Sequence, residues 1–484
     1  MSKKLNILFA ASEVAPFAKT GGLADVAGAL PLELEKLGHD VCVVLPYYKM
    51  IKNGSYKIEN TGKTISVKIS DKDIYADIYT TKIGKNVTVY LVGNDSYYDR
   101  DELYRTKEGD YADNAERFIF FSKAIIELAQ KVEFKPDIMH LNDWQTGLVP
   151  ILLKYLEKDN LFYKGVRTIF TIHNLAYQGL FWHLDMHLTN LPWDAFTSKE
   201  IEYYGKINLL KAGIVGADIV TTVSKKYCEE IQTPEYGCGL EGVLKNRKKD
   251  LYGILNGVDY NEWSPEKDRY IAKNYSLDKY ADKFVCRQDL LSEYKLSLDS
   301  KVPVIGVISR LADQKGFDLI EESIDEIITM GYAFILLGTG EQKYHDLFTG
   351  IAKKYPKMAG IEIGFNNALA HKIEAGCDFF LMPSRFEPCG LNQIYSLKYG
   401  TIPVVRATGG LDDTICDFNP SSPKGNGFKF DGYTSKGLLN KLKDAMKVFK
   451  DKTKWNTVVE NAMKCDFSWK KSAQEYVQIY TINK

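Results

Sequence analysis

A basic loop with two glycines lies near the start of the chain, and its composition suits an anion. Lys19-Thr20-Gly21-Gly22 falls between a short apolar run and a helical pattern, with Asp25 in the first turn of the expected helix. Glycines let the backbone approach a ligand closely, and the amides and dipole at a helix N-terminus favour negative charge. We therefore predict that this loop binds phosphate. A tight turn with a solvated lysine is the alternative, because the full GxGxxG dinucleotide pattern is absent.

A second basic loop follows an apolar run in the other half of the chain. Arg310 and Lys315 flank the stretch Ser309–Gly316, at the expected carboxyl end of a strand, where open α/β sheets bind ligands. Two cations can neutralise a diphosphate, which a single cation does less well. We expect the two basic loops to face each other across a cleft and to serve one anionic donor and one acceptor. The alternative is a solvated basic loop.

A carboxylate in a tightly turned loop is the third candidate. Ser384–Leu391 follows the apolar run Phe379–Met382 and contains a proline and a glycine, which indicate a rigid turn. Glu387 would lie at the ligand edge of the sheet, where it could bond sugar hydroxyls or balance the charge of a leaving sugar. The alternatives are a surface salt bridge between Glu387 and Arg385, and a merely buried position for Cys389.

Polar clusters follow two further predicted strands in the first half of the chain. The residue types that bind sugar hydroxyls in these clusters are Asp143, His173, Asn174 and Gln178. The carboxyl ends of parallel strands meet at one edge of a sheet, so we expect these side chains to gather there. A single histidine is usually a hydrogen-bonded core residue, but two clusters at one edge favour binding.

Metal ligands are poorly supported by the sequence. The eight cysteines are scattered without a CxxC pair, which indicates reduced thiols in a cytoplasm. The adjacent Asp412 and Asp413 lie within Gly409–Thr414, a segment with the pattern of a glycine-rich phosphate loop opening a helix. We expect no catalytic metal and no cofactor, because basic side chains would stabilise a leaving diphosphate instead.

Charge and hydropathy exclude several classes of partner. Lys plus Arg and Asp plus Glu number 63 each, so the net charge is zero, and nothing favours nucleic acid or an acidic membrane surface. No run approaches the roughly 18 apolar residues of a membrane-spanning helix. The apolar start, Leu5–Ala11, could be a brief signal peptide, but Asn6 and Glu13 favour a buried first strand.

Short apolar runs alternate with helical patterns along the chain. The runs expected to be strands are Leu5–Ala11, Val41–Leu45, Ile138–Leu141, Thr168–Ile172, Ile219–Val223, Pro303–Ser309, Phe334–Leu337, Phe379–Met382 and Ile402–Val405. Strands without polar alternation suit a sheet covered on both faces. Residues 56–92 do alternate, which predicts a β-hairpin excursion. The pattern occurs twice, so we predict an α/β protein with two Rossmann-like, doubly wound domains.

The expected boundaries follow from this repetition. Residues 1–252 would form the first domain and residues 253–466 the second. Residues 467–484 should form a helix that begins after Ser468 and has one apolar stripe, made of Trp469, Ala473, Tyr476, Val477 and Tyr480. Such a stripe must dock on another part of the protein.

Six segments together resemble bacterial glycogen synthases and plant starch synthases. In chain order they are Lys19–Val26, His173–Gly179, Ser309–Leu311, Gln314–Gly316, Glu387–Leu391 and Gly409–Thr414. The resemblance runs nearly end to end and implies the GT-B fold, in which two Rossmann-like domains face across a cleft and a C-terminal helix crosses back to the first. The first domain would take the acceptor and carry the 19–26 donor loop, and the second would take the nucleotide sugar. The implied reaction transfers glucose from ADP-glucose to the non-reducing 4-hydroxyl of an α-1,4-glucan, with retention of configuration.

The resemblance also implies roles for individual residues. At the diphosphate it places Lys19, Gly21, Gly22, Arg310 and Lys315, with Asp25 fixing the first loop. At the transferred glucose it places Glu387 and His173, with Asp143 and Asn174 nearby. Backbone amides of Cys389, Gly390 and Leu391 would serve sugar and phosphate, and Tyr104 and Asn256 would lie near the donor.

The implied mechanism is electrostatic, because no carboxylate is clearly placed as a nucleophile on the opposite face of the sugar. Domain closure would exclude water and protect the donor from hydrolysis. Phe365 stands where several bacterial members have a tyrosine that stacks on adenine, which leaves open the preference for ADP-glucose over UDP-glucose. A UDP-glucose enzyme, such as one of sucrose or trehalose pathways, is the first rival, although it should not carry Lys19–Val26 together with Glu387–Leu391. A catalytically silent glucan-binding protein is the second, although it should lack the charged donor residues. The sequence leaves the oligomeric state open.

Overall fold

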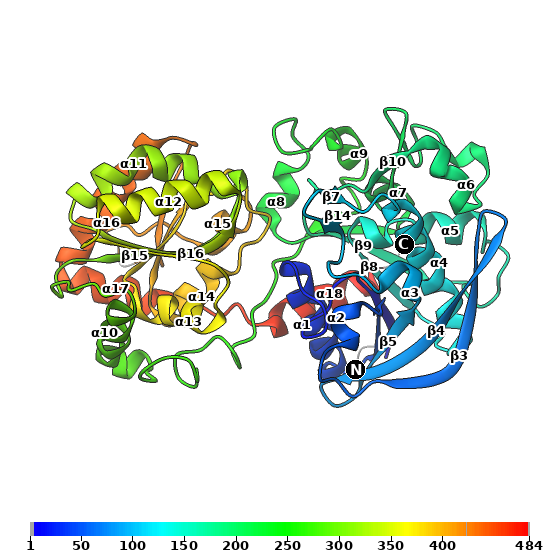
Figure 1. Cartoon of the computed structure of the whole chain (residues 1–484), viewed down its shortest axis with the longest axis horizontal. Helices are drawn as coiled ribbons and strands as arrows, with labels where there is room; N and C mark the ends of the chain where they lie inside the picture. The colour runs from blue at the N-terminus through cyan, green and yellow to red at the C-terminus, as the bar shows by residue number, and fades with distance from the viewer. Residues whose placement is uncertain (1–3, 423, 483–484) are drawn as a thin grey trace. The chain divides into compact units, whose positions relative to one another are not determined.

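The computed structural model describes residues 4–422 and 424–482. The chain divides into two compact units (Figure 1). The first holds the residues up to Val223, Cys228–Gly257 and the segment from Trp469 onward, and the second holds Ser224–Tyr227 and Val258–Ser468. The main crossings between units therefore lie at 257/258 and 468/469, compared with the expected 252/253 and 466/467.

A nine-stranded sheet forms the centre of the first unit. In spatial order its strands are β14 (Leu251–Gly253), β13 (Ile219–Thr222), β9 (Arg167–Ile172), β8 (Ile138–Asn142), β1 (Asn6–Ala10), β2 (Asp40–Pro46), β5 (Val87–Gly93), β4 (Lys72–Ile83) and β3 (Glu59–Ile69). The pairings from β14 to β5 are all parallel, and β4 and β3 add antiparallel neighbours at one edge. Every residue of β8 is buried, as a sheet covered on both faces requires.

The prediction of a β-hairpin excursion at 56–92 is wrong in one respect. This region does contain the β3–β4 hairpin, but it also contributes β5, which pairs in parallel with β2 and so belongs to the central sheet. The alternation along β3 has a physical cause, since α4 (Asn114–Lys131) packs against this strand. One covered face and one solvated face give the period of two that the sequence shows.

Helices cover the first sheet, and smaller elements join them. The longer helices are α1 (Gly22–Lys36), α4, α5 (Val149–Tyr155), α7 (Leu209–Gly216) and α18 (Trp469–Thr481). The short helices are α2 (Lys49–Lys52), α3 (Asp95–Tyr98), α6 (Met186–Thr189) and α9 (Glu241–Asn246). Helix α8 (Lys225–Glu230) is divided between the two units after Tyr227. A small antiparallel sheet has the order β10 (Leu180–Trp182), β12 (Lys206–Asn208) and β11 (Glu202–Tyr203), and β6 (Arg105–Thr106) pairs with β7 (Gly109–Asp110).

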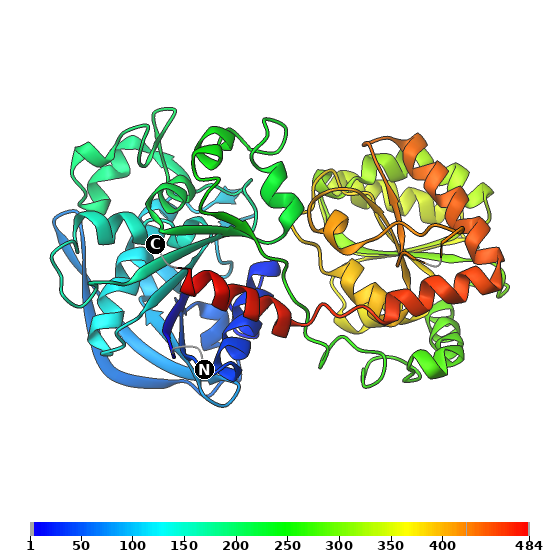
Figure 2. The same cartoon turned by 180° about the vertical axis from the view of Figure 1, so that it is seen from behind.

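The last helix, α18, packs on the first unit, where it contacts α1 (red and blue in Figure 2). Its buried face contains Trp469, Ala473, Tyr476 and Tyr480, as the stripe predicts, but Val477 is only half-buried and Ile479 takes its place. The Tyr480 hydroxyl lies 2.7 Å from His140 Nδ1 in the core. This bond holds α18 against β8, an interior strand of the sheet.

A six-stranded parallel sheet forms the second unit. Its order is β17 (Ala359–Ile363), β16 (Ala333–Gly340), β15 (Val304–Leu311), β18 (Phe379–Met382), β19 (Ile402–Arg406) and β20 (Phe428–Phe430). Its helices are α10 (Lys283–Glu293), α11 (Phe317–Thr329), α12 (Gln342–Lys354), α13 (Asn367–Gly376), α14 (Asn392–Tyr399), α15 (Gly409–Thr414), α16 (Ser435–Lys450) and α17 (Lys452–Met463). Helices α11 and α12 lie on one face of the sheet, and α10, α13 and α14 lie on the other (Figure 1). Both units are thus doubly wound, as predicted.

None of the helices within residues 4–422 and 424–482 combines the length and the apolar character that crossing a bilayer requires.

Candidate active site

The predicted site residues of the first unit lie at its topological switch point. Strand β1 pairs with β2 on one side and with β8 on the other, so the connections leaving β1 and β8 run in opposite directions and open a crevice. The loop after β1 leads to Lys19, and Asp143 follows β8 directly. His173 follows β9, the next strand along. The expected gathering of these segments at one sheet edge is confirmed.

The basic loop at 19–22 is held by a carboxylate that the sequence motifs did not single out. Glu13 is 5% exposed. Its carboxylate accepts hydrogen bonds from Thr20 N at 2.5 Å, Thr20 Oγ1 at 2.6 Å, Gly21 N at 3.1 Å and the Tyr104 hydroxyl at 2.9 Å. Lys19 Nζ pairs with Asp25 Oδ1 at 2.6 Å. Two backbone amides are therefore already occupied, and the loop is shaped by Glu13 and Asp25.

The space beside the two glycines of this loop is empty of other protein atoms. A Cβ placed on Gly21 or Gly22 would meet no atom within 4 Å, and Gly21 has the extended φ of −154° that any residue can adopt. The protein's own packing does not require glycine at either position. Open space in front of the N-terminus of α1 is what close approach by a phosphate group needs.

Asp143 and His173 are brought together at the ends of β8 and β9. Asp143 Oδ1 accepts a hydrogen bond from His173 N at 2.8 Å. Burial raises the pKa of Asp143 to about 7, and the His173 amide opposes this shift. Asp143 also has a φ of 56°, which costs a non-glycine residue about 1–3 kcal/mol and is typical of functional sites.

The imidazole of His173 is held neutral and in one tautomer. Burial lowers its pKa to about 3. Its Nε2 lies 2.9 Å from Asn142 Oδ1, while Asn142 Nδ2 donates to Ala10 O at 2.9 Å. Because Asn142 thereby presents its oxygen, His173 Nε2 is the donor and Nδ1 is left as an acceptor. A neutral acceptor of this kind suits a sugar hydroxyl.

Two polar residues near this edge make hydrogen bonds within the protein. His140 is fully buried, with Nε2 at 2.7 Å from Thr171 Oγ1 and Nδ1 bonded to α18. Gln178, expected to grip sugar hydroxyls, donates to Cys238 O at 2.9 Å and accepts from Asn208 Nδ2 at 2.7 Å. Each end of the Gln178 amide makes one bond within the fold, and its binding of a sugar hydroxyl stays a prediction.

The remaining predicted residues of the first unit differ in their environments. Asn174 is half-buried, and its Oδ1 accepts from Ala176 N at 3.1 Å. Tyr104 bonds both Glu13 and Ser12, the latter at 2.8 Å, so it supports the 19–22 loop. Asn256 is buried, and its Oδ1 has no hydrogen-bond partner among the described residues. A buried amide oxygen without a partner is uncommon in a folded protein.

The second unit has its switch point between β15 and β18, and the predicted charges lie there. Lys315 Nζ pairs with Glu387 Oε2 at 2.7 Å, with 20% and 7% of the two side chains exposed. Ser384 Oγ donates to the same oxygen at 3.1 Å. Arg310 is exposed, with its guanidinium 3.5 Å from Gln314 Oε1. The structure thus joins a lysine and a glutamate that are far apart in the sequence.

Backbone contacts between two loops position this pair. Arg385 N donates to Gln314 O at 2.8 Å, and Gln314 Nε2 donates to Phe386 O at 3.1 Å. Gly316 has a φ of 74°, and a Cβ there would lie 2.1 Å from Pro383 O, so only glycine allows this approach. The Arg385 side chain pairs with Asp318 at 2.7 Å. The alternative of a Glu387–Arg385 salt bridge is therefore wrong.

The glycines at 409 and 410 support the same loop and do not form an open phosphate cradle. A Cβ on Gly409 would lie 1.9 Å from Glu387 O, and Gly410 N donates to the carbonyl oxygens of Glu387 and Pro388 at 3.1 and 3.2 Å. The two following aspartates bind Lys429 and the Lys226 amide. The expected helix does begin here, as α15, while the binding of phosphate by this segment stays a prediction.

The N-terminal end of helix α14 follows the loop that carries Glu387. Leu391 precedes the first residue of α14, and Gly390 has a φ of 71° with Gln393 packed against its Cα. The first amides of a helix have no intrahelical acceptor and favour an anion. Cys389 is buried and is not part of a disulfide. Phe365 is 88% exposed in a loop of the same unit, as a ring that stacks on a ligand would be.

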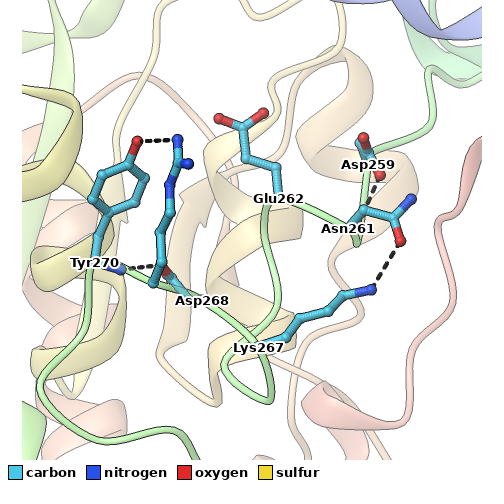
Figure 3. Close-up of a pocket in the computed structure, with 7 residues that line it drawn as sticks. Asp259, Asn261, Glu262, Lys267, Asp268 and Tyr270 are labelled. Carbon is cyan, nitrogen blue, oxygen red and sulfur yellow. Dashed lines mark hydrogen bonds between the residues drawn. The ribbon is translucent and has the colours of Figure 1, made fainter. Parts of the chain in front are cut away.

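Other cavities and clusters add no chemistry to this site. A pocket of about 320 Å³ in the second unit is lined by the 259–270 loop (Figure 3). Its polar groups largely satisfy one another, since Lys267 binds Asn261 at 2.8 Å and Arg269 binds Tyr270 at 2.7 Å. In the part of the chain that the structure describes, no three His, Cys, Asp or Glu side chains gather as a metal site.

Comparisons with known proteins match both units. The model of the starch synthase catalytic domain matches residues 6–246, and that of glycosyl transferases group 1 matches residues 292–462. The glycogen synthase of Koribacter versatilis (strain Ellin345) is 50% identical over 479 residues, with 98% of each chain covered. That of Thermosipho africanus (strain TCF52B) is 47% identical over 482 residues, again with 98% of each covered.

A solved structure extends the similarity to three dimensions. The catalytic domain of Starch Synthase IV from Arabidopsis thaliana, bound to ADP and acarbose, has a TM-score of 0.90 to this chain at 32% identity, with 99% of each covered. Sucrose-phosphate synthase from Thermosynechococcus elongatus, at 15% identity and a TM-score of 0.57, shares the fold alone. The predicted fold class is confirmed.

Proposed function

Since the chain belongs to the glycogen and starch synthase family, we propose that it elongates an α-1,4-glucan with glucose from ADP-glucose, retaining the configuration at the anomeric carbon. The substrates are a nucleotide sugar and the non-reducing end of glycogen or a malto-oligosaccharide. The Arabidopsis relative was solved with ADP and acarbose, which supports an adenine nucleotide here. The reaction would take place in the cytoplasm, where the eight cysteines, none of which is part of a disulfide, stay reduced.

The observation that carries this proposal is the Lys315–Glu387 pair at a switch point. A lysine held at 2.7 Å from a carboxylate is oriented before any substrate arrives, and preorganised charge is the main source of electrostatic catalysis. Lys315 would stabilise the departing diphosphate together with the exposed Arg310. Glu387 would bond hydroxyls of the transferred glucose and balance its developing positive charge.

The first unit would supply the rest of the donor and sugar contacts. Lys19 and the open backbone at Gly21 and Gly22 would contact the diphosphate. His173 would accept a hydrogen bond from a sugar hydroxyl through Nδ1, and Asp143 would fix the His173 backbone. Burial around both side chains strengthens such polar contacts by lowering the local dielectric.

The chemical step balances without a covalent enzyme intermediate. The bond between the anomeric carbon and the diphosphate oxygen breaks first, and its electron pair leaves with ADP. The acceptor 4-hydroxyl attacks the oxocarbenium-like carbon from the same face, and its proton passes to the departing phosphate. We propose that no metal takes part, because basic side chains stabilise the leaving group.

Transfer of radiolabelled glucose to glycogen tests the proposal. Equal concentrations of ADP-glucose and UDP-glucose should be compared, each with and without EDTA, and we expect label from ADP-glucose in both arms. The labelled product should be released by β-amylase, which cleaves only α-1,4 linkages from the chain end. Preferred turnover of UDP-glucose would refute the donor assignment, and loss of activity with EDTA would refute the metal-free step. No transfer from either nucleotide sugar would refute the function itself.

A further inference from the structure

Two carbonyl groups of the loop before α14 are held by one buried side chain. Gln393 is fully buried, and its Nε2 donates to Cys389 O and to Gly390 O, at 3.0 Å in both cases. Gly390 and Leu391, in contrast, are half-buried and lie where the loop reaches the surface. Gln393 therefore holds the outer part of this loop from inside the second unit.

The direction of these carbonyl groups sets the direction of the next two amides. Both peptide bonds are trans, and in a planar trans peptide the N–H points opposite to the C=O. The Gly390 and Leu391 amides therefore point away from Gln393, and neither has an acceptor among the residues that the structure describes. Gly390 has a φ of 71°, and successive amides around a left-handed residue form a concavity that binds anions.

A second buried side chain fixes the peptide before them. Ser224 is fully buried in the second unit, and its Oγ donates to Pro388 O at 2.6 Å. Ser224 Oγ also accepts a hydrogen bond from Tyr227 N at 3.2 Å, so the hydroxyl is itself held in one orientation. Three consecutive carbonyl groups, from Pro388 to Gly390, are thus bonded by buried side chains. Rotation of any of these peptide planes would break a buried hydrogen bond.

The contacts of Gln393 add little to stability by themselves. Its Oε1 is buried without a hydrogen-bond partner among the described residues. An unsatisfied buried acceptor costs about as much free energy as one or two donated bonds return. An apolar side chain of similar volume would therefore stabilise the fold equally well, so the donation to two loop carbonyls indicates a role in orientation.

We propose that Gln393 is a positioning residue, which turns the Gly390 and Leu391 amides toward the diphosphate of the bound nucleotide sugar. Ser224 assists by fixing the preceding peptide. This inference rests on the proposed function, because that function supplies the diphosphate. The two N–H groups lie in the loop that also carries Glu387, and oriented donors stabilise the negative charge that develops on a leaving group without further reorganisation.

Binding of phosphate compounds in the absence of an acceptor is the first test. Gln393→Met keeps most of the side-chain volume and removes the donor, and we expect it to weaken the binding of ADP and of inorganic pyrophosphate about tenfold in calorimetry. Adenosine, which has no phosphate, should bind within about twofold of the wild type. Gln232→Met is the matched control, since Gln232 Nε2 also donates to a backbone carbonyl, Cys228 O at 2.7 Å, but lies in the first unit.

Two binding results would overturn the proposal. Unchanged affinity of Gln393→Met for ADP and pyrophosphate would mean that the amides do not meet the diphosphate. An equal loss of adenosine affinity would mean that the substitution only disturbs the fold.

Kinetics and a second variant complete the test. With saturating substrates, kcat of Gln393→Met should fall about 10–100-fold, while KM for glycogen stays within about twofold, because glycogen does not meet these amides. A rise in KM for glycogen as large as the loss of kcat would also overturn the proposal. Ser224→Ala should weaken ADP binding about threefold, and if Gln393→Met does not fold, unchanged ADP affinity in folded Ser224→Ala would refute the role of these contacts.

Failure of this inference and failure of the proposed function have different signatures. If the wild-type protein transfers glucose from neither nucleotide sugar, the proposed function fails. Pyrophosphate carries no base and no sugar, so a selective loss of pyrophosphate binding in Gln393→Met would still support the positioning role.

Discussion

Replacement of Lys315 by alanine is the most informative change at the proposed site. The Lys315 ammonium is fixed 2.7 Å from Glu387 Oε2, and we assign it to the charge that develops on the departing diphosphate. Removing one preorganised charge stabiliser costs about 2.7–4 kcal/mol in the barrier. We therefore expect kcat to fall roughly 10²–10³-fold or more, while glycogen binding is unchanged.

The same change should also lower stability, by an amount that follows from burial. Glu387 keeps only 7% of its side chain exposed, so without Lys315 its charge stays in a poorly solvated position. Breaking a fully buried pair costs about 3–5 kcal/mol. We expect a smaller loss, about 1–3 kcal/mol, because 20% of the lysine side chain is already exposed.

A second substitution separates the two effects. Lys315→Ala with Glu387→Gln removes both charges and leaves Ser384 a neutral partner, so the double variant should recover much of the lost unfolding free energy but none of the rate. Initial rates with labelled ADP-glucose give kcat, and urea unfolding gives stability. Lys343→Ala is the control, because Lys343 pairs with Asp313 in the same unit with 54% of its side chain exposed.

Two results would refute the reasoning. Turnover by Lys315→Ala within about threefold of the wild type would mean that this lysine stabilises no transition-state charge. Recovery of kcat in the double variant would mean that the Lys315–Glu387 pair affects activity only by stabilising the folded protein.

Three further changes test other parts of the structure. Glu13→Gln removes the charge that holds the 19–22 loop, so KM for ADP-glucose should rise about tenfold or more, and an unchanged KM would contradict a donor role for this loop. Asp143 has a native pKa of about 7 against an ordinary value of 3.8, so between pH 4 and pH 7 the folded protein holds a proton that the unfolded chain has lost. Stability should therefore fall as pH rises through this range, and Asp143→Asn should flatten the dependence in urea titrations; equal slopes would argue against the shift. Tyr480→Phe leaves His140 Nδ1 without its hydroxyl partner and should lower the stability of the first unit by about 1–3 kcal/mol in thermal unfolding, whereas an unchanged midpoint would show that water replaces the bond.

Much of the fold was predictable because burial on both faces leaves a plain signature. Runs such as Phe379–Met382 contain no polar alternation, and this strand occupies those very residues. The ligand edge followed from strand direction alone, which placed the loops at 143 and 387 correctly. The parallel pairing of β5 was not predictable. Buried and half-buried residues alternate along most of this strand, and this is the same pattern that the preceding hairpin shows.

The missed features depend on contacts between distant residues. Glu13 lies three residues after the end of β1, and its position after a buried strand was a usable signal, but its partners appear only when the 19–22 loop folds back. Lys315 and Glu387 meet because β15 and β18 are neighbours, and strand order is not visible in residue spacing. His140 and His173 look alike in sequence, and only the folded structure, in which Tyr480 and Thr171 occupy both ring nitrogens of His140, identifies the first as a core residue.

The return of α18 to the first unit has a consequence for synthesis on the ribosome. About 210 residues separate Gly257 from Trp469, and translation at about 5–20 residues per second needs roughly 10–40 s to make them. During that interval the surface of α1 and the imidazole of His140 that await α18 are uncovered. Until α18 is made, the first unit lacks one of its own helices, and we expect a chaperone to bind the nascent chain most strongly at that stage.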